Sequence, residues 1–137
     1  MRVFIDTVVV MFAAGAEHPL REPSRRILTA VGSGALDAVT STEVVQEIAH
    51  RFVAIGRRDI AERLTADALD LFAPVLPVTH AVVRRLPDLI ARYPGLAARD
   101  LIHVATCQHE GIVEIVSPDR GFDIVAGIRR LDPTEFT

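Results

Sequence analysis

The sequence predicts one α/β domain in which a central, mostly parallel sheet of about four or five strands is flanked by helices. Short apolar stretches alternate with longer amphipathic ones along all 137 residues. The short stretches are almost wholly apolar, as is typical of strands buried on both faces. Half of the residues are hydrophobic, and no repeat or linker interrupts residues 1–137. The chain is therefore expected to bury a sizeable core within a single domain.

The short apolar stretches give the predicted strands in chain order. Each consists of a few apolar residues, often β-branched, and lies between segments with helical periodicity or turn residues. The strands are expected at residues 2–5, 36–39, 75–78, 112–116 and 128–131.

The helices are predicted from caps, breakers and the spacing of apolar residues. Thr7 is expected to cap the first helix, Pro87 to kink or split the fifth, and Gly111 to end the last. In the third helix, an apolar stripe is expected to run from Val44 to Ile55. The helices are expected at residues 8–14, about 23–31, 42–55, 57–72, 79–93 and 96–110.

Composition and charge exclude several classes of protein. The formal net charge is −3, and all fifteen basic residues are arginine, whose forked donors suit phosphates. No stretch is apolar for long enough to span a membrane, and Asp6 interrupts the only candidate signal segment. The single cysteine indicates a reducing, cytoplasmic setting. No glycine-rich nucleotide-binding motif occurs, and one tyrosine without any tryptophan argues against base stacking as the main binding device.

Two acidic residues lie where an open α/β sheet usually binds its ligand, beyond the carboxyl ends of the strands. Asp6 follows the first predicted strand, and Asp119 follows the fourth. A turn of the type SPDRGFD, which contains Asp119 and Asp123, also occurs without any function. We nevertheless expect Asp6 and Asp119 to meet at one edge of the sheet.

Two helical acids join them as candidates. Asp100 is at the edge of the apolar stripe of its helix, although a pair with Arg99 or a favourable place in the first turn would also explain it. Glu47 flanks the stripe of residues 42–55, although an (i, i+4) pair with Arg51 is the alternative. Glu43 has capping-box spacing from Thr40 and is assigned to capping rather than to chemistry.

Four carboxylates in one pocket would repel one another, and a divalent cation would offset that repulsion. Oxygen ligands with open water positions suit Mg²⁺ or Mn²⁺, which can assist the cleavage of a phosphodiester. A Cys107–His103 dyad is conceivable from the (i, i+4) spacing, but Cys107 is better explained as a small buried hydrophobe. His103 is close enough to Asp100 in sequence to support it indirectly. The five histidines do not predict a zinc site.

The chain resembles the PIN-domain nucleases, and more closely the VapC-type toxins of bacterial toxin–antitoxin pairs. The resemblance covers essentially the whole chain in the family's order. The matching stretches are FIDT at 4–7, TSTEVVQEIAHRF at 40–52, ARDLIHVATCQHEGI at 98–112, IVSPDRGFD at 115–123 and LDP at 131–133.

The resemblance implies a PIN-like α/β/α fold and a Mg²⁺- or Mn²⁺-dependent endoribonuclease, usually a homodimer, inhibited by a small antitoxin protein. It places the catalytic and metal-binding acids at Asp6, Glu47, Asp100 and Asp119. Asp123 matches an additional acid of many members and is a fifth candidate. The chain departs from the family at Val8, where a small polar residue is common, so any hydrogen bond from such a side chain is absent here.

Two other functions remain open at this point. The chain could be a catalytically weak metal- or RNA-binding module that acts through a protein partner, an interpretation that Val8 favours. It could also be an RNA-processing nuclease outside any toxin pair. For a nuclease, Arg51, Arg99 and Arg120 are candidates for contacts with RNA phosphates, while solvated surface is the ordinary role of each.

Overall fold

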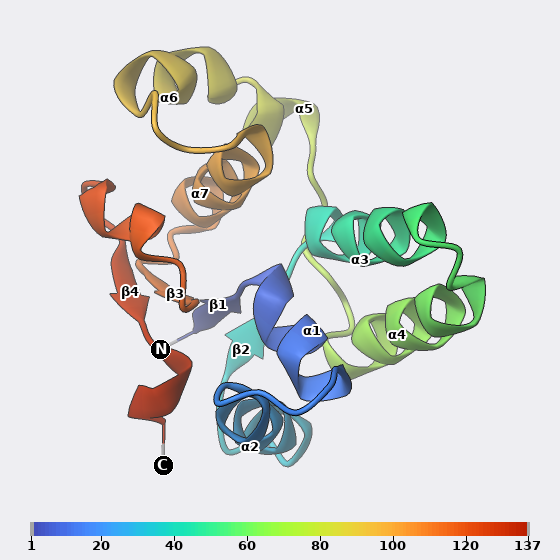
Figure 1. Cartoon of the computed structure of the whole chain (residues 1–137). Helices are drawn as coiled ribbons and strands as arrows, with labels where there is room; N and C mark the ends of the chain where they lie inside the picture. Colours follow the sequence, from blue (N-terminus) through green and yellow to red (C-terminus); the bar gives the residue numbers. More distant parts are fainter. Residues whose placement is uncertain (1, 137) are drawn as a thin grey trace.

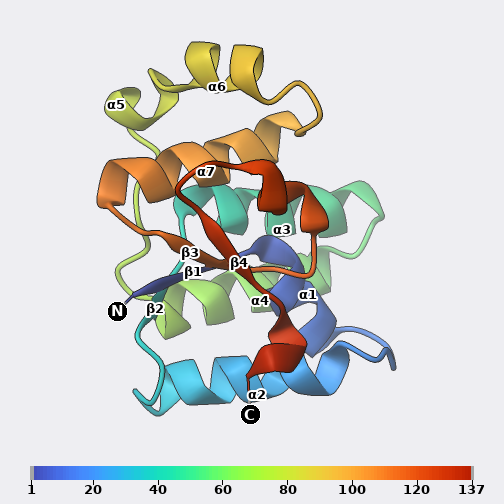
Figure 2. The ribbon, with the colours of Figure 1, turned by 90° about the vertical axis from the view of Figure 1, so that its left-hand side faces the viewer.

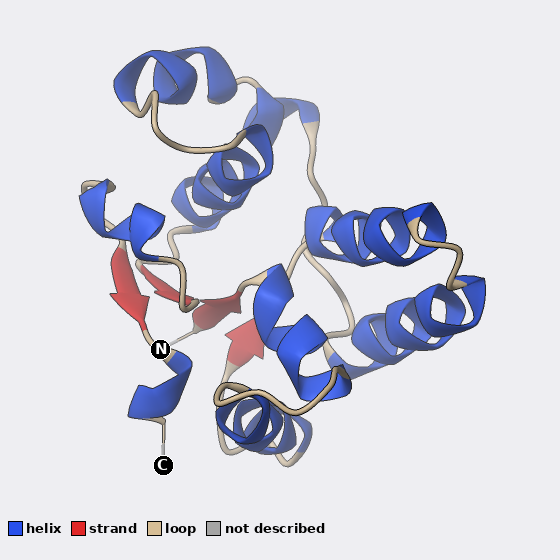
Figure 3. Cartoon of the chain, viewed as in Figure 1, coloured by secondary structure: helices blue, strands red, loops and turns tan. Residues whose placement is uncertain are grey.

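The computed structural model of the protein describes residues 2–136. In this part of the chain, four strands form one parallel sheet in the order β2-β1-β3-β4 (Figures 1 and 3). The strands are β1 (Val3–Ile5), β2 (Ala38–Val39), β3 (Glu114–Val116) and β4 (Arg129–Leu131). The α/β class and the parallel sheet predicted from the sequence are therefore confirmed.

Helices cover the sheet on both sides. In Figure 2, α7 lies above the sheet and beneath α5 and α6, whereas α2 lies below it. Helices α3 and α4 pack against each other, and α3 also contacts α1 and α7. The helices are α1 (Thr7–Ala14), α2 (Arg21–Gly32), α3 (Thr42–Ala54), α4 (Arg58–Leu71), α5 (His80–Val83), α6 (Leu86–Arg92) and α7 (Ala98–Glu110), with short 3-10 turns η1 (Arg120–Ile124) and η2 (Pro133–Glu135).

The carboxyl ends of the four observed strands fall at the predicted residues. β1 ends at Ile5, β2 at Val39, β3 at Val116 and β4 at Leu131, although each begins one or two residues later than expected. These ends matter because the segments that follow them carry Asp6 and Asp119. The core beneath them is built from large side chains that are fully buried, including Phe4, Phe122 and Ile115.

The predicted strand at 75–78 is wrong. Leu76 forms only an isolated parallel bridge to Ser41, outside the four strands of the sheet. The N–H of Leu76 donates to the carbonyl of Thr40, and its carbonyl accepts from the N–H of Thr42, both at 2.9 Å. Pro74 and Pro77 stand on either side, and a proline has no N–H with which to continue a ladder.

Pro87 splits the predicted helix 79–93, as expected. It occupies the first turn of α6, where its missing N–H costs no helical hydrogen bond. The prediction for α3 was less accurate at its end, because the helix stops at Ala54 and the side chain of Ile55 is 65% exposed. The apolar stripe therefore stops short of Ile55.

The predicted cap of α1 is wrong by one residue. Thr7 is the first residue of the helix, and the carboxylate of Asp6 accepts a hydrogen bond from the Thr7 N–H. An acidic cap also interacts favourably with the positive end of the helix dipole. No helix in residues 2–136 combines the length and the apolar character needed to cross a membrane.

Candidate functional site

Four predicted acids surround one cavity of about 190 Å³ at the carboxyl edge of the sheet. Asp6 follows β1 and Asp119 follows β3, while Glu47 comes from α3 and Asp100 from the first turn of α7 (Figure 1). Thr7, Val8, Met11, Arg51 and Arg99 complete the lining. The predicted meeting of residues far apart in sequence is thus present in the structure.

Asp6 is almost fully buried, yet both of its carboxylate oxygens have donors. The Thr7 N–H donates to Oδ1 at 2.8 Å, and the hydroxyl of Ser117 donates to Oδ2 at 2.7 Å. Burial raises the pKa of Asp6, and the nearby His103 and these hydrogen bonds oppose that rise. The charge that interrupts the apolar start of the sequence therefore has a hydrogen-bond donor for each of its oxygens.

Ser117 is a residue of the candidate site that the sequence did not predict. Its buried hydroxyl donates to Asp6 and also accepts from the N–H of Asp119 at 3.0 Å. It thereby fixes the two strand-end acids relative to each other. The only signal in the sequence was a serine directly after a buried strand and two residues before an acid.

Asp119 is held by the turn that it begins. Its Oδ1 accepts from the N–H of Gly121 at 2.8 Å and so caps the short turn η1. A side chain at residue 121 would crowd this carboxylate, because an added Cβ would lie 3.1 Å from Oδ1 and 3.2 Å from Leu96. Glycine therefore leaves Asp119 free to take its place at the cavity.

Glu47 contacts a histidine rather than the arginine considered as its local partner. Its Oε1 lies 2.8 Å from Nε2 of His103, and the ion pairs among residues 2–136 do not include one between Glu47 and Arg51. The same Nε2 is 3.5 Å from Oδ1 of Asp6. Burial opposes a charge on His103, but Glu47, Asp6 and Asp100 outweigh it and raise the pKa of the imidazole.

Asp100 is half-buried and close to the other acids. Burial, followed by repulsion from Asp6, raises the pKa of Asp100 to about 6, with Asp119 and Glu47 adding to the effect. No ion pair with Arg99 occurs in the described part of the chain. One ligand atom each from Asp6, Asp100 and His103 lies within 4.8 Å of the others.

Glu43 does not form the predicted capping box with Thr40. Ser41 is the cap of α3 and accepts from the N–H of Val44, while the Thr40 hydroxyl donates to the carbonyl of Ile5 at 2.9 Å. Thr40 does not cap α3 because its side chain faces the end of β1. Burial and the nearby Glu47 raise the pKa of Glu43.

Asp123 lies apart from the cavity. Its carboxylate pairs with Arg130, with Nε and Oδ1 2.8 Å apart. That hydrogen bond lowers the pKa of Asp123. The structure therefore does not bring the fifth candidate acid to the other four.

The thiol of Cys107 is no partner for His103. Cys107 is fully buried and free, and burial raises the pKa of its thiol to about 12. A thiol that stays protonated is a poor nucleophile. The imidazole of His103 instead faces Glu47 and Asp6.

Two buried oxygens at the cavity lack hydrogen-bond partners within residues 2–136. They are the hydroxyl oxygen of Thr7 and Oε1 of Glu47, and Oε1 has a close polar neighbour, Nε2 of His103 at 2.8 Å. Buried polar atoms usually have a partner, so the Thr7 oxygen at the cavity indicates a bound ion, water or ligand. With three further carboxylates alongside, the donor set fits a hard divalent cation.

Comparison with known proteins places this chain in a family. Residues 3–128 match the PIN domain. The chain is 38% identical to ribonuclease VapC13 of Mycobacterium tuberculosis over 129 residues, which cover 94% of this chain and 98% of that protein.

The fold is that of two solved structures of low sequence identity. FitAcB from Neisseria gonorrhoeae aligns with a TM-score of 0.75 and 21% identity over 99% of this chain and 100% of that chain. A toxin–antitoxin complex from Klebsiella pneumoniae aligns with a TM-score of 0.69 and 18% identity over 96% of this chain and 97% of that chain. The chain belongs to the PIN-domain family, and within it to the VapC proteins.

Proposed function

We propose that this protein is a Mg²⁺- or Mn²⁺-dependent endoribonuclease that hydrolyses RNA phosphodiester bonds and acts as the toxin of a toxin–antitoxin pair. The observation that carries the proposal is the convergence of Asp6, Glu47, Asp100 and Asp119 on one polar cavity. The ribonuclease name of a relative that is 38% identical supports the chemistry. The fold shared with a toxin–antitoxin complex supports the biological role.

Asp6, Asp100 and Asp119 would hold the cation, with Glu47 as a further ligand or as the group that orients the attacking water. When bound, a divalent cation supplies charge that stabilises the developing negative charge on the phosphodiester. Asp123 is left out of this set because it pairs with Arg130. Oxygen-only donors at an open cavity favour Mg²⁺ and Mn²⁺ over Zn²⁺.

The protein's own residues supply the remaining parts. Arg51 and Arg99 line the cavity beside the acids, where their guanidinium groups would bind the phosphates on either side of the scissile bond. Arg120 does not line this cavity and is a weaker candidate. Ser117 holds Asp6 and Asp119 in a fixed relative position while the substrate binds.

The test is RNA cleavage by the purified chain with Mg²⁺ or Mn²⁺, with and without EDTA. We expect cleavage that EDTA stops and that Asp6→Asn and Asp100→Asn each lower by at least about a hundredfold. Asp123→Asn is the matched control, because it removes a carboxylate outside the cavity and should keep nearly full activity. Full activity in Asp6→Asn and Asp100→Asn would rule out the carboxylate mechanism. Metal-dependent RNA binding without cleavage would favour a binding module instead.

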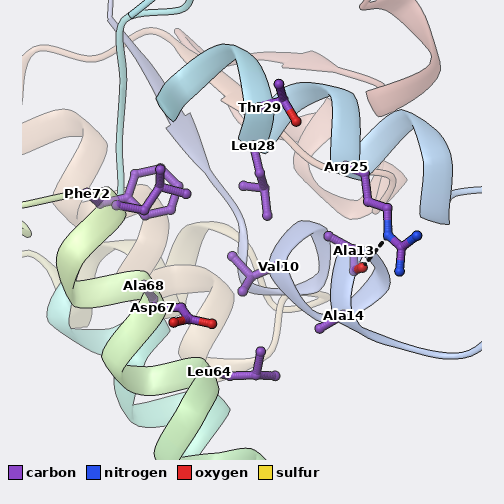
Figure 4. A pocket seen from close by; sticks show the side chains of 11 residues that line it. Val10, Ala13, Ala14, Arg25, Leu28, Thr29, Leu64, Asp67, Ala68 and Phe72 are labelled. Carbon is purple, nitrogen blue, oxygen red and sulfur yellow. Dashed lines mark hydrogen bonds between the residues drawn. The ribbon is translucent and has the colours of Figure 1, made fainter. Parts of the chain in front are cut away.

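A second cavity, on the other side of α1, is the site we propose for the antitoxin partner. A mostly apolar cavity of about 410 Å³ lies between α1, α2 and α4, and its lining includes Val10, Leu28 and Leu64 (Figure 4). Arg25, which donates to the carbonyl of Ala13, and Asp67 add polar groups. We propose that an apolar segment of the antitoxin binds there.

This surface can be tested with a matched pair of exposed alanines. Ala14→Arg would place a charged side chain at the cavity, whereas Ala126→Arg would place one in the loop between η1 and β4. Binding of the cognate antitoxin protein should weaken at least about tenfold in the first variant and stay unchanged in the second. Equal affinities in both variants would show that the antitoxin binds to another surface.

Three further parts of the proposal concern the whole chain. We propose that residues 1–137 act as one domain, that the protein is cytoplasmic, as its single cysteine suggests, and that it forms a homodimer. Val83 and Ile90 are 44% and 55% exposed on α5 and α6 and offer apolar surface for a second copy. Light scattering on the purified protein will give the mass of the assembly.

A further inference from the structure

His103 is a fully buried ionisable residue immediately behind the acidic cavity. It projects from α7 one turn after Asp100, and its ring lies 5.4 Å from that of Phe4, which is itself buried in β1. It is not among the residues that line the cavity. Its position therefore allows it to act on the acids from behind, without contact with the RNA.

Only one nitrogen of this ring has polar neighbours. Nε2 lies 2.8 Å from Oε1 of Glu47 and 3.5 Å from Oδ1 of Asp6, whereas Nδ1 has no carboxylate neighbour; neither nitrogen makes a regular hydrogen bond within residues 2–136. A neutral imidazole carries its hydrogen on one nitrogen, and the nitrogen that faces acceptors is the favoured one. The hydrogen therefore belongs on Nε2, between the two carboxylates.

Glu47 depends on this contact. Its side chain is only 11% exposed, and Oε1 makes no regular hydrogen bond in the described chain, so Nε2 of His103 is the close polar neighbour of that oxygen. A buried carboxylate oxygen without a donor would turn toward water. The histidine keeps it directed inward and so fixes the orientation of the whole carboxylate.

We propose that His103 is a positioning residue that holds Glu47 through Nε2–H, with Asp6 as the second neighbour of the same nitrogen. The proposal rests on the proposed function in one respect, which is that Glu47 serves the metal or the attacking water. Residues that orient metal ligands are worth about 10- to 100-fold in metal affinity or activity in other proteins. His103 would have this effect although it touches neither the substrate nor the ion.

The contact itself can be tested in the metal-free protein, with no assay of activity. The ring nitrogens of ¹⁵N-labelled histidine report by NMR which nitrogen carries hydrogen, and the signals absent from His103→Gln identify this ring. We expect hydrogen on Nε2 and a clear change of its shift in Glu47→Gln. Hydrogen on Nδ1 alone, or a shift unchanged by Glu47→Gln, would overturn the proposal.

The effect on the site is measured as Mn²⁺ affinity, with three substitutions of His103. A glutamine amide N–H can take the place of Nε2–H, whereas an asparagine amide reaches only the place of Nδ1, which has no partner. His103→Gln should therefore keep the affinity within a few fold, and His103→Asn and His103→Leu should lower it by about 10- to 100-fold. Equal losses in all three variants would indicate core packing and contradict the proposal.

A double-substitution cycle tests whether His103 acts through Glu47. In the Glu47→Gln background, His103→Asn should cost little further Mn²⁺ affinity, because the positioned carboxylate is already gone. Additive losses would contradict the proposal.

Circular dichroism confirms that each variant is folded. Should His103→Leu fail to fold, the comparison of His103→Gln with His103→Asn still tests the proposal. NMR support for the contact in a protein that cleaves no RNA would reject the proposed function and leave the contact established.

Discussion

At the scale of single residues, the site depends on how a buried charge is satisfied. Asp6 has a backbone donor for one oxygen and the Ser117 hydroxyl for the other, so its carboxylate is held in one orientation. Hydrogen bonds to a charged group are stronger than those between neutral groups. Ser117 also accepts from the N–H of Asp119, so this one serine connects two acids of the site.

The first prediction concerns this serine. Ser117→Ala should lower Mn²⁺ affinity by about 10- to 100-fold, because Asp6 loses a donor and Asp119 loses its link to Asp6. Titration of free Mn²⁺ by electron paramagnetic resonance measures the change. Ser24→Ala is the control, since Ser24 is equally buried but its hydroxyl has no partner in the described chain. An unchanged affinity in Ser117→Ala would show that Asp6 needs no such support.

The second prediction follows from the pKa of Asp100, which is raised to about 6 from an ordinary value of 3.8. The folded state binds this proton more tightly than the unfolded state, so the carboxyl contributes stability below about pH 4 that is lost as pH rises toward 6. In EDTA, the free energy of unfolding of the wild type should therefore fall relative to that of Asp100→Asn across this window. The relative change should be roughly 1–2 kcal/mol, less than the full shift because Asp100 is half-exposed.

Urea unfolding at several pH values between 4 and 6.5 measures this difference. Asp123→Asn serves as the contrast, because the pKa of Asp123 is lowered by Arg130 and its stability contribution is lost as pH falls below 3.8. Parallel pH profiles for the wild type and Asp100→Asn would contradict the raised pKa of Asp100, which burial and then repulsion from Asp6 cause.

The residues of the site were predictable to different degrees. Asp6 and Asp100 could be found because each occupies a place that local structure explains poorly, an apolar strand end and the edge of an apolar helix stripe. Ser117 and the contact between His103 and Glu47 could not, because they join segments that only the folded chain brings together. The capping roles of Thr7 and Glu43 failed because several neighbouring side chains could each cap the helix, and sequence spacing does not choose among them.

At the scale of the elements, the ends of strands and helices position the acids. The carboxyl ends of β1 and β3 were predicted correctly because a charge or a Ser-Pro pair ends each apolar run. The false strand at 75–78 shows the limit of apolar character as a signal, since Pro74 and Pro77 remove the donors that a ladder needs. Helix α7 matters most, because it carries both Asp100 and His103.

The third prediction tests how α7 ends. Gly111 has a φ of +70°, and beyond it the Ile112 N–H donates to the carbonyl of Cys107 at 2.9 Å, which is the pattern of a glycine C-cap. Gly111→Ala should lower the free energy of unfolding by about 1 kcal/mol, because an L side chain is strained there.

Urea unfolding measures this loss, and Gly95→Ala is its control, since Gly95 does not have a positive φ and has open space around it. Mn²⁺ affinity should be unchanged in both variants, because Gly111 lies at the opposite end of α7 from Asp100. A Gly111→Ala protein as stable as the wild type would contradict the capping role.

At the scale of the whole molecule, a short parallel sheet gathers side chains from distant parts of the chain. β1 lies in the middle of the sheet beside β3, so Asp6 and Asp119 become neighbours although more than a hundred residues separate them. Helices α3 and α7 then bring Glu47 and Asp100 to the same edge. The fold class was predictable because alternating strands and helices allow few other arrangements. The oligomeric state and the partner surface were not predictable, because an apolar helix face can pack into the core, against a second copy or against a partner.

The central claim is that these four carboxylates form one divalent-metal site, and anomalous diffraction from crystals grown with Mn²⁺ tests it most directly. We predict an anomalous peak in the cavity, at coordination distance from Asp6 and Asp100, that is absent from crystals of Asp100→Asn. A well-ordered wild-type crystal with no peak in this cavity at saturating Mn²⁺, or with Mn²⁺ bound only elsewhere, would contradict the claim.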